Sequence, residues 1–225
     1  MSVKQNYERI SEQIKAAKIL ANRNDDVTLI AVTKEVSADV AKEVLAEGIM
    51  QLGENRFEGL KDKQEQIQDD VVWHFIGSLQ TRKVKDIIHR IDYLHSLDRL
   101  SLAEEIQKRA TEPLKCFLQV NVSGEESKHG LDPSEVLEFA RQLAEFDKVK
   151  VVGLMTMAPF TENELIIRNS FKGLKELQEK VKELQIANIP CTELSMGMSN
   201  DFEIAIEEGA SFIRIGTDLV GKGRV

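Results

Sequence analysis

Apolar and polar positions alternate along this chain with two different periods. Residues 1–23 have apolar side chains at helical spacings of three and four, which predicts an amphipathic helix. Its apolar stripe consists of Tyr7, Ile10, Ile14, Ala17 and Ala21. After this helix, short and nearly continuous apolar runs alternate with longer amphipathic stretches. Runs of that kind are typical of strands that are covered on both faces.

The apolar runs predict eight strands. They are residues 27–33, 49–52, 71–76, 93–96, 116–121, 151–155, 192–195 and 212–215. The stretches between them carry signals of helix ends, because Gly48 and Gly209 follow amphipathic segments and suit a helix C-terminus. Asn200 and Glu203 form a capping pair that predicts a helix beginning near residue 200.

This repeat predicts a (β/α)8 TIM barrel with an extra N-terminal helix, and a single domain that spans residues 1–225. A doubly wound open sheet is the alternative. Such a sheet normally has fewer strands and places a phosphate-binding loop after its first strand. The glycine-containing polar loops of this chain instead follow the seventh and eighth predicted strands, which favours the barrel.

Composition narrows the classes of function. The formal net charge is −8, which disfavours binding to nucleic acids or to acidic membranes. No apolar run approaches the ~20 residues that span a bilayer. Cys116 and Cys191 are far apart and lie in or beside apolar runs, as expected of buried thiols in a reducing compartment. We therefore expect a cytoplasmic protein. Because the acidic sequence shows no obvious large apolar patch, we also expect a monomer.

In a TIM barrel the functional residues gather where the strands end. Lys34 directly follows the first predicted strand. We expect its amine to be partly desolvated, which favours the neutral form that attacks carbonyl groups to form Schiff bases. The alternative is a surface lysine, the first polar residue of a loop, whose charged end reaches water.

The loops after the last two strands suit a phosphate group. Gly197 and Ser199 precede the helix expected near residue 200, and Gly216 and Thr217 follow the eighth strand. Backbone N–H groups at such positions, with little side chain in the way, are where many barrels bind phosphate. Each glycine alone is also compatible with an ordinary tight turn.

Each of the other candidate site residues has two interpretations. Arg214 lies in an apolar strand, either in a structural ion pair or facing a ring nitrogen of a cofactor. Asn55 suits either contact with a cofactor ring or a helix cap. His74 and His95 are more often hydrogen-bonded core residues than ligand contacts.

The chain resembles the pyridoxal phosphate homeostasis proteins. The matching motifs are Ala-Val-Thr-Lys at 31–34, Gly-Glu-Asn at 53–55, Trp-His-Phe-Ile-Gly at 73–77, Gly-Leu-Met at 153–155, Leu-Ser-Met-Gly-Met-Ser at 194–199 and Arg-Ile-Gly-Thr at 214–217. They run from the first predicted strand to the last, so the resemblance covers essentially the whole chain.

The resemblance implies a barrel like the N-terminal domain of alanine racemase, and a Schiff base between pyridoxal 5′-phosphate (PLP) and Lys34. It also implies phosphate contacts from Ser199 and from the backbone of Gly216 and Thr217. Arg214 would lie near the pyridine nitrogen, and Asn55 would line the pocket. The implied role is to hold PLP in intracellular vitamin B6 homeostasis, with apo PLP-dependent enzymes as recipients.

Two physical points favour a carrier over an enzyme. The barrel is expected to end near Gly216 and the chain ends at Val225, so we expect no second domain to supply an acid–base group from the opposite face. An arginine at the ring nitrogen disfavours the protonated ring, which makes the ring a weaker electron sink. A PLP-dependent amino-acid racemase is the alternative. A class I aldolase, in which the lysine attacks a sugar phosphate directly, is a third reading.

Overall fold

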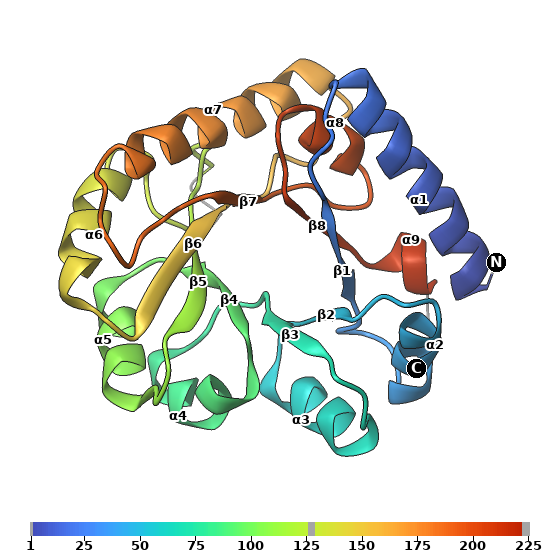
Figure 1. Cartoon of the computed structure of the whole chain (residues 1–225), viewed down its shortest axis with the longest axis horizontal. Helices are drawn as coiled ribbons and strands as arrows, with labels where there is room; N and C mark the ends of the chain where they lie inside the picture. Colours follow the sequence, from blue (N-terminus) through green and yellow to red (C-terminus); the bar gives the residue numbers. More distant parts are fainter. Residues whose placement is uncertain (1, 126–128, 222–225) are drawn as a thin grey trace.

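The computed structural model describes residues 2–125 and 129–221. The basic tail at 222–224, which its sequence suggests to be solvated, lies outside the described residues. Eight parallel strands pair in chain order and close into a barrel, and helices surround it (Figure 1). The predicted TIM barrel is therefore confirmed. Closure is made by β1 and β8, which pair in parallel from Thr28 opposite Phe212 to Ala31 opposite Ile215.

The strands are β1 Thr28–Val32, β2 Gln51–Glu54, β3 Val72–Phe75, β4 Tyr93–Leu97, β5 Leu114–Gln119, β6 Val149–Met155, β7 Glu193–Ser195 and β8 Phe212–Ile215. The α-helices are α1 Val3–Leu20, α2 Ala38–Ala46, α3 Phe57–Gln66, α4 Val84–Ile87, α5 Leu100–Arg109, α6 Val136–Gln142, α7 Glu164–Lys182, α8 Phe202–Glu207 and α9 Thr217–Val220. Short 3₁₀ helices occupy η1 Thr81–Lys83, η2 Ile88–Arg90 and η3 Leu143–Glu145.

Two strands are shifted by two residues from their predicted positions. β2 continues through Gly53 and Glu54, which pair with β3, because the buried charge of Glu54 is matched by Lys63. β5 begins at Leu114 and ends at Gln119, because the exposed side chain of Lys115 is accommodated at the rim of the barrel. The spacing of apolar residues alone does not show that a strand contains a polar residue such as Glu54 or Lys115.

The buried residues form two cores. A small cluster consists of Ile30, Phe117, Val152, Met155 and Phe212, and it fills the barrel between the strands. The larger core lies between the outer face of the strands and the helices, as in other barrels of this architecture. The interior of the barrel is therefore packed, and ligands reach only its ends.

Helix α1 covers the seam where the barrel closes, against α8, α9 and α2 (Figure 1). A capping box between Ser2 and Gln5 begins the helix. The expected apolar stripe packs inward, with Ile10 and Ala17 buried. The helix ends at Leu20 instead of continuing to residue 23.

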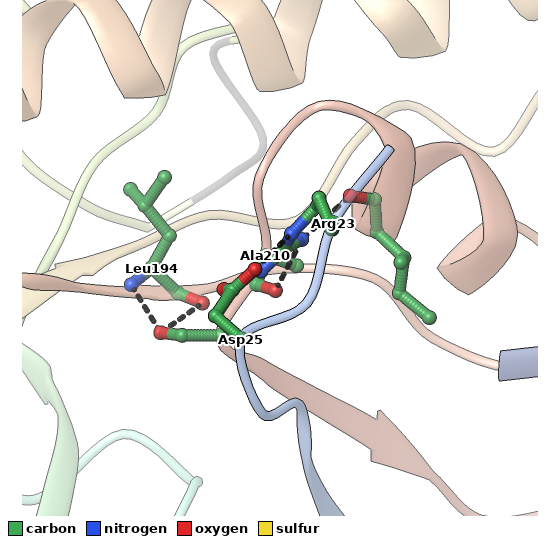
Figure 2. Close-up of polar contacts among 6 residues, drawn as sticks. Arg23, Asp25, Leu194 and Ala210 are labelled. Carbon is green, nitrogen blue, oxygen red and sulfur yellow. Dashed lines mark hydrogen bonds and ion pairs between the residues drawn. The ribbon is translucent and has the colours of Figure 1, made fainter. Parts of the chain in front are cut away.

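Arg23 fixes the end of this segment to the neighbouring α8–β8 loop (Figure 2). Its Nη1 donates hydrogen bonds of 2.6 Å to the backbone oxygen of Ile206 and 2.9 Å to that of Ala210. Asp25 pairs with the same guanidinium. Since these carbonyls lie at the end of α8, the side chain links the entry to β1 with the entry to β8.

In the described residues, no helix is both long enough and apolar enough to span a bilayer.

Candidate functional site

A cavity of about 300 Å³ lies at the carboxyl ends of β1 and β8. Three of the residues singled out in the sequence, Lys34, Gly216 and Thr217, contribute to its wall. The remaining lining residues are Val32, Glu35, Val36, Val220 and Gly221. The volume is at the lower end of the ~300–1,000 Å³ that is usual for small-molecule sites. Residues 182 positions apart thus meet because the first and last strands are neighbours.

Lys34 lies in the turn that follows β1. Its side chain is 41% exposed, and its Nζ is 4.0 Å from a carboxylate oxygen of Glu35. The turn places this side chain at the cavity wall with more than half of its surface covered, and its partial desolvation stays a prediction. The backbone of the turn is held by a hydrogen bond of 3.2 Å from the Val36 nitrogen to the Thr33 oxygen.

Gly216 joins β8 to the short helix α9 and leaves free space in the cavity wall. A methyl group built on it would meet Val32 no closer than 3.6 Å, which is ordinary van der Waals contact. Protein packing therefore does not require glycine there, whereas a ligand against this backbone would. Thr217 begins α9, where the first N–H groups have no acceptor within the helix.

Helix α1 holds α9 in place through Asn6. This buried side chain donates a hydrogen bond of 2.9 Å to the backbone oxygen of Leu219. Arg9 donates to the backbone oxygen of Asp218 at 3.3 Å. Neither residue was predicted from the sequence, since a polar side chain beside an apolar stripe carries little local signal of such a contact.

The loop between β7 and α8 contains Ser199, which is half-buried. The helix begins at Phe202 and its N-cap is Asp201, so the prediction of a start near Asn200 was early by two residues. An oxygen of Asp201 accepts a hydrogen bond of 2.6 Å from the Met198 nitrogen and thereby fixes the loop. Among the described residues that line the cavity, Ser199 is not included.

Gly197 has a structural role in the same loop. Its φ is +93°, and an added Cβ would lie 2.6 Å from the Cβ of Ala205 and 2.9 Å from the Cα of Phe202. Only glycine fits that backbone and that close approach.

Asn55 is half-buried in the loop after β2 and, within the described residues, is not part of the cavity wall either. Its backbone packs against Gly77, where an added Cβ would lie 2.3 Å from the Asn55 backbone oxygen. Gly77 therefore sets the position of the loop that carries Asn55.

Arg214 points into the barrel from β8 and is only 4% exposed. Its Nη1 donates a hydrogen bond of 2.5 Å to Ser195 Oγ, and its Nη2 donates one of 2.9 Å to the backbone oxygen of Thr156. Burial lowers the pKa of Arg214 to about 10, and the negative charge of Asp201 opposes this shift. The guanidinium thus stays charged at neutral pH while it contacts uncharged oxygen atoms.

His74 and His95 are fully buried and hydrogen-bonded to each other, as the core reading of both residues predicts. His74 Nδ1 lies 2.9 Å from His95 Nε2, and His95 Nδ1 lies 2.9 Å from Ser195 Oγ. Burial lowers the pKa of His74 to about 3 and that of His95 well below its usual range. Both imidazoles are therefore neutral.

A buried ion pair next to the cavity was not foreseen. Lys63 Nζ lies 3.1 Å from Glu54 Oε1, and both side chains are almost fully buried. Burial raises the pKa of Glu54, while the hydrogen bond from Thr33 and the charge of Lys63 lower it. Glu54 Oε2 is the one buried side-chain nitrogen or oxygen of the described residues without a hydrogen-bond partner.

The described residues contain no group of three or more metal-ligating side chains. Cys116 and Cys191 are buried free thiols, and burial raises the pKa of both. The polar groups of the cavity wall are the amine of Lys34, the carboxylate of Glu35, the hydroxyl of Thr217 and backbone N–H groups, with a buried guanidinium in the adjoining strand.

The chain is similar to known proteins along nearly its whole length. The family model described as alanine racemase, N-terminal domain, matches residues 5–223. A pyridoxal phosphate homeostasis protein of Aquifex aeolicus (strain VF5) is 41% identical over 227 residues, a match that covers 99% of each chain. The present chain belongs to the pyridoxal phosphate homeostasis protein family. A member of the family from Escherichia coli (strain K12) is 33% identical, with 96% of this chain and 94% of that protein covered.

Solved structures agree with this family assignment. PipY of Synechococcus elongatus PCC7942, in a structure without PLP, has a TM-score of 0.87 and 31% identity, and the match covers 98% of this chain and 100% of that one. The same protein with PLP bound has a TM-score of 0.82 and 32% identity, with coverage of 93% and 99%. Alanine racemase of Clostridium difficile 630 has a TM-score of 0.78 at 15% identity and 56% coverage of its own chain, which shows the shared fold alone.

Proposed function

We propose that this protein binds PLP in the cavity at the ends of β1 and β8 and holds it as a Schiff base on Lys34. The observation that carries the proposal is the meeting of Lys34, Gly216 and Thr217 in one cavity wall. An amine can form a Schiff base with an aldehyde, and backbone N–H groups can donate hydrogen bonds to a phosphate. Family members named for PLP homeostasis, and the PLP-bound structure of PipY, support the same cofactor.

The residues fit the two ends of the cofactor. Gly216 leaves room for a phosphate against the backbone, and the N–H groups at the start of α9 are available to bind it. On this proposal the Ser199 hydroxyl completes the phosphate site from the β7–α8 loop. Asn55 contributes from the β2–α3 loop. Both contacts stay predictions, because neither residue lines the cavity of the described structure.

Arg214 would face the pyridine nitrogen from β8, the strand that directly precedes Gly216. Two of its nitrogens are already bonded to Ser195 and Thr156, so its guanidinium has a fixed place. A cation there stabilises the unprotonated ring and makes it a poor electron sink. The bound cofactor would supply carbonyl chemistry at Lys34, while the surrounding residues hold it without promoting turnover.

We therefore favour a protein that captures and releases PLP in the cytoplasm and supplies apo PLP-dependent enzymes. The exposure of the Lys34 side chain suits exchange with solvent. The names of the family members refer to homeostasis. We further expect the protein to act as a monomer, which sedimentation at micromolar concentration will test.

The decisive test is to mix the purified protein with PLP, record the visible spectrum, reduce with borohydride and locate the added mass by peptide mapping. We expect a yellow protein and a pyridoxyl group on Lys34. Lys34→Ala should lose the colour, whereas Lys42→Ala, an exposed lysine of α2 paired with Asp39, should retain it. Absence of a specific adduct in the unmodified protein would refute the proposal and direct attention to sugar phosphates.

Carrier and enzyme differ in a second measurement. The loaded protein is incubated with amino acids in deuterated water, and separately with an apo PLP-dependent enzyme. A carrier restores the activity of the apo-enzyme and leaves α-protons in place. Rapid α-proton exchange that depends on Lys34 would instead establish a racemase-like activity.

A further inference from the structure

A continuous row of hydrogen bonds crosses the interior of the barrel. It begins at Gln51 in β2, passes through His74 in β3, His95 in β4 and Ser195 in β7, and ends at Arg214 in β8. The distances between the bonded atoms are 2.7, 2.9, 2.9 and 2.5 Å in that order. The two histidines and the serine are 0% exposed, so water does not compete for these bonds.

The direction of every bond follows from the atoms present. Gln51 Oε1 can only accept, so His74 Nε2 carries the proton and donates to it. A neutral His74 then has an unprotonated Nδ1, which accepts from His95 Nε2. By the same reasoning His95 Nδ1 accepts from the hydroxyl of Ser195.

The last bond completes the pattern. Since the Ser195 proton points toward His95, the oxygen presents a lone pair to Arg214, and a guanidinium can only donate. All donors therefore point from Arg214 toward Gln51, and each bond polarises the next in the same sense. The end of the row is an amide oxygen, a very weak base, so the row orients groups and does not carry protons away.

Packing locks the two rings in this arrangement. His74 stacks on Tyr93 with ring centroids 4.6 Å apart and planes 12° apart. His95 stacks on Phe117 at 4.4 Å and 24°. A 180° flip of either ring would keep its stacked contact but would put carbon atoms in place of both bonded nitrogens, so it would break two hydrogen bonds.

We infer that His95 and His74 are positioning residues, which hold Arg214 as a cation in one orientation at the cofactor end of the barrel. They touch neither the cavity nor Lys34, and act only through Ser195 and Arg214. The place of the cofactor ring in this inference rests on the proposed function. The pattern of tautomers does not rest on the proposed function, because it is measured in the protein without PLP.

The first measurement is ¹H–¹⁵N correlation NMR of the imidazole groups in the protein without PLP. We expect both buried histidines in the neutral Nε2–H form throughout the range around neutral pH. A protonated ring, or an Nδ1–H form at either residue, would overturn the inference even if PLP binds to Lys34.

The second measurement compares His95→Phe with His95→Gln. Phenylalanine keeps the contact with Phe117 but makes no hydrogen bond, whereas glutamine can accept from Ser195 and donate to His74. We expect the PLP dissociation constant of His95→Phe to rise about tenfold, and the visible absorption maximum of its bound PLP to shift. His95→Gln should lie closer to the unmodified protein in both properties.

A control variant distinguishes this result from the effect of a general loss of stability. Val152→Ala removes packing from the same interior without touching the row of hydrogen bonds, and it should leave the absorption maximum unchanged. If His95→Phe lowers the melting temperature but keeps the wild-type absorption maximum and affinity, the row is only structural and the inference fails. Failure of the unmodified protein to form the Lys34 adduct would refute the proposed function, and the NMR result would still decide the tautomers.

Discussion

The hydroxyl of Thr33 donates a hydrogen bond of 2.6 Å to Glu54 Oε1. Because Thr33 is the residue directly before Lys34, this bond ties the chain at Lys34 to the end of the neighbouring strand. Glu54 is held in turn by Lys63 of α3, at 3.1 Å. The position of the exposed lysine thus depends on a buried charge pair beneath it.

Removal of Lys63 should therefore be costly. Lys63→Met leaves the carboxylate of Glu54 buried without its counter-charge, which typically destabilises a protein by about 3–5 kcal/mol. Urea unfolding measures the change. Lys61→Met, on the exposed face of the same helix, should cost less than about 1 kcal/mol because its pair with Glu65 is solvated.

The double variant Lys63→Met, Glu54→Gln decides the cause. It removes both charges and keeps the hydrogen bond from Thr33, so it should recover much of the lost stability. A double variant as unstable as Lys63→Met alone would show that the packing of the Lys63 stem, and not the charge of Glu54, is responsible.

The barrel was predictable from the sequence because its strands are buried on both faces and its helices on one, which leaves strong apolar periods. β8 was predicted to the residue, since an apolar run from Phe212 to Ile215 has clear ends. β2 was displaced because its last residue is a buried glutamate whose partner, Lys63, is nine residues away. Periodicity carries no information on such pairings.

The candidate site was predictable in part for a different reason. Lys34, Gly216 and Thr217 meet because closure of a barrel makes its first and last strands neighbours. The exposure of Lys34 and the burial of Asn6 depend on the path of individual turns and helices, which no short-range pattern specifies. The row that joins Gln51 to Arg214 has residues on five strands, so only the folded barrel reveals it.

Substitution by alanine should have opposite effects at Gly216 of the cavity wall and at Gly197 of the β7–α8 loop. Gly216→Ala places a methyl group in the cavity without a close protein contact, so it should leave the melting temperature nearly unchanged and weaken PLP binding by about tenfold or more. Gly197→Ala forces a Cβ to 2.6 Å from Ala205 at a φ of +93°, so it should destabilise the fold. Thermal unfolding and PLP titration of both variants test the contrast. Unchanged affinity in Gly216→Ala would place the phosphate elsewhere.

The buried histidines predict how stability changes with pH. His74 has its pKa lowered to about 3 by burial and by the charge of Lys115, and the pKa of His95 is lowered by burial, His74 and Arg214. In the unfolded chain both bind protons near pH 6.5. The unfolded state therefore holds more protons below about pH 6.5, and the free energy of unfolding falls as pH falls, by up to about 1.4 kcal/mol per pH unit for each histidine.

Urea unfolding between about pH 7 and pH 5 measures this slope. His74→Gln removes one titrating group, so its slope should be smaller than that of the unmodified protein whatever its absolute stability. His89→Gln, at an exposed position in η2, is the matched control and should keep the original slope. Equal slopes in all three proteins would contradict a neutral, buried His74.

Asn6 connects α1 to the cavity wall, so its replacement should affect both stability and PLP binding. Its amide donates to the backbone oxygen of Leu219, and α9 follows directly on Gly216. Asn6→Leu keeps much of the side-chain volume but leaves that buried oxygen without its donor, at a cost of about 1–3 kcal/mol. If α9 helps to bind the phosphate, PLP affinity should fall as well. Lys4→Leu, on the exposed side of α1, should change neither the stability of the barrel core nor PLP affinity by a comparable amount. An Asn6→Leu protein that is less stable yet binds PLP as tightly as the unmodified protein would separate α9 from the phosphate site.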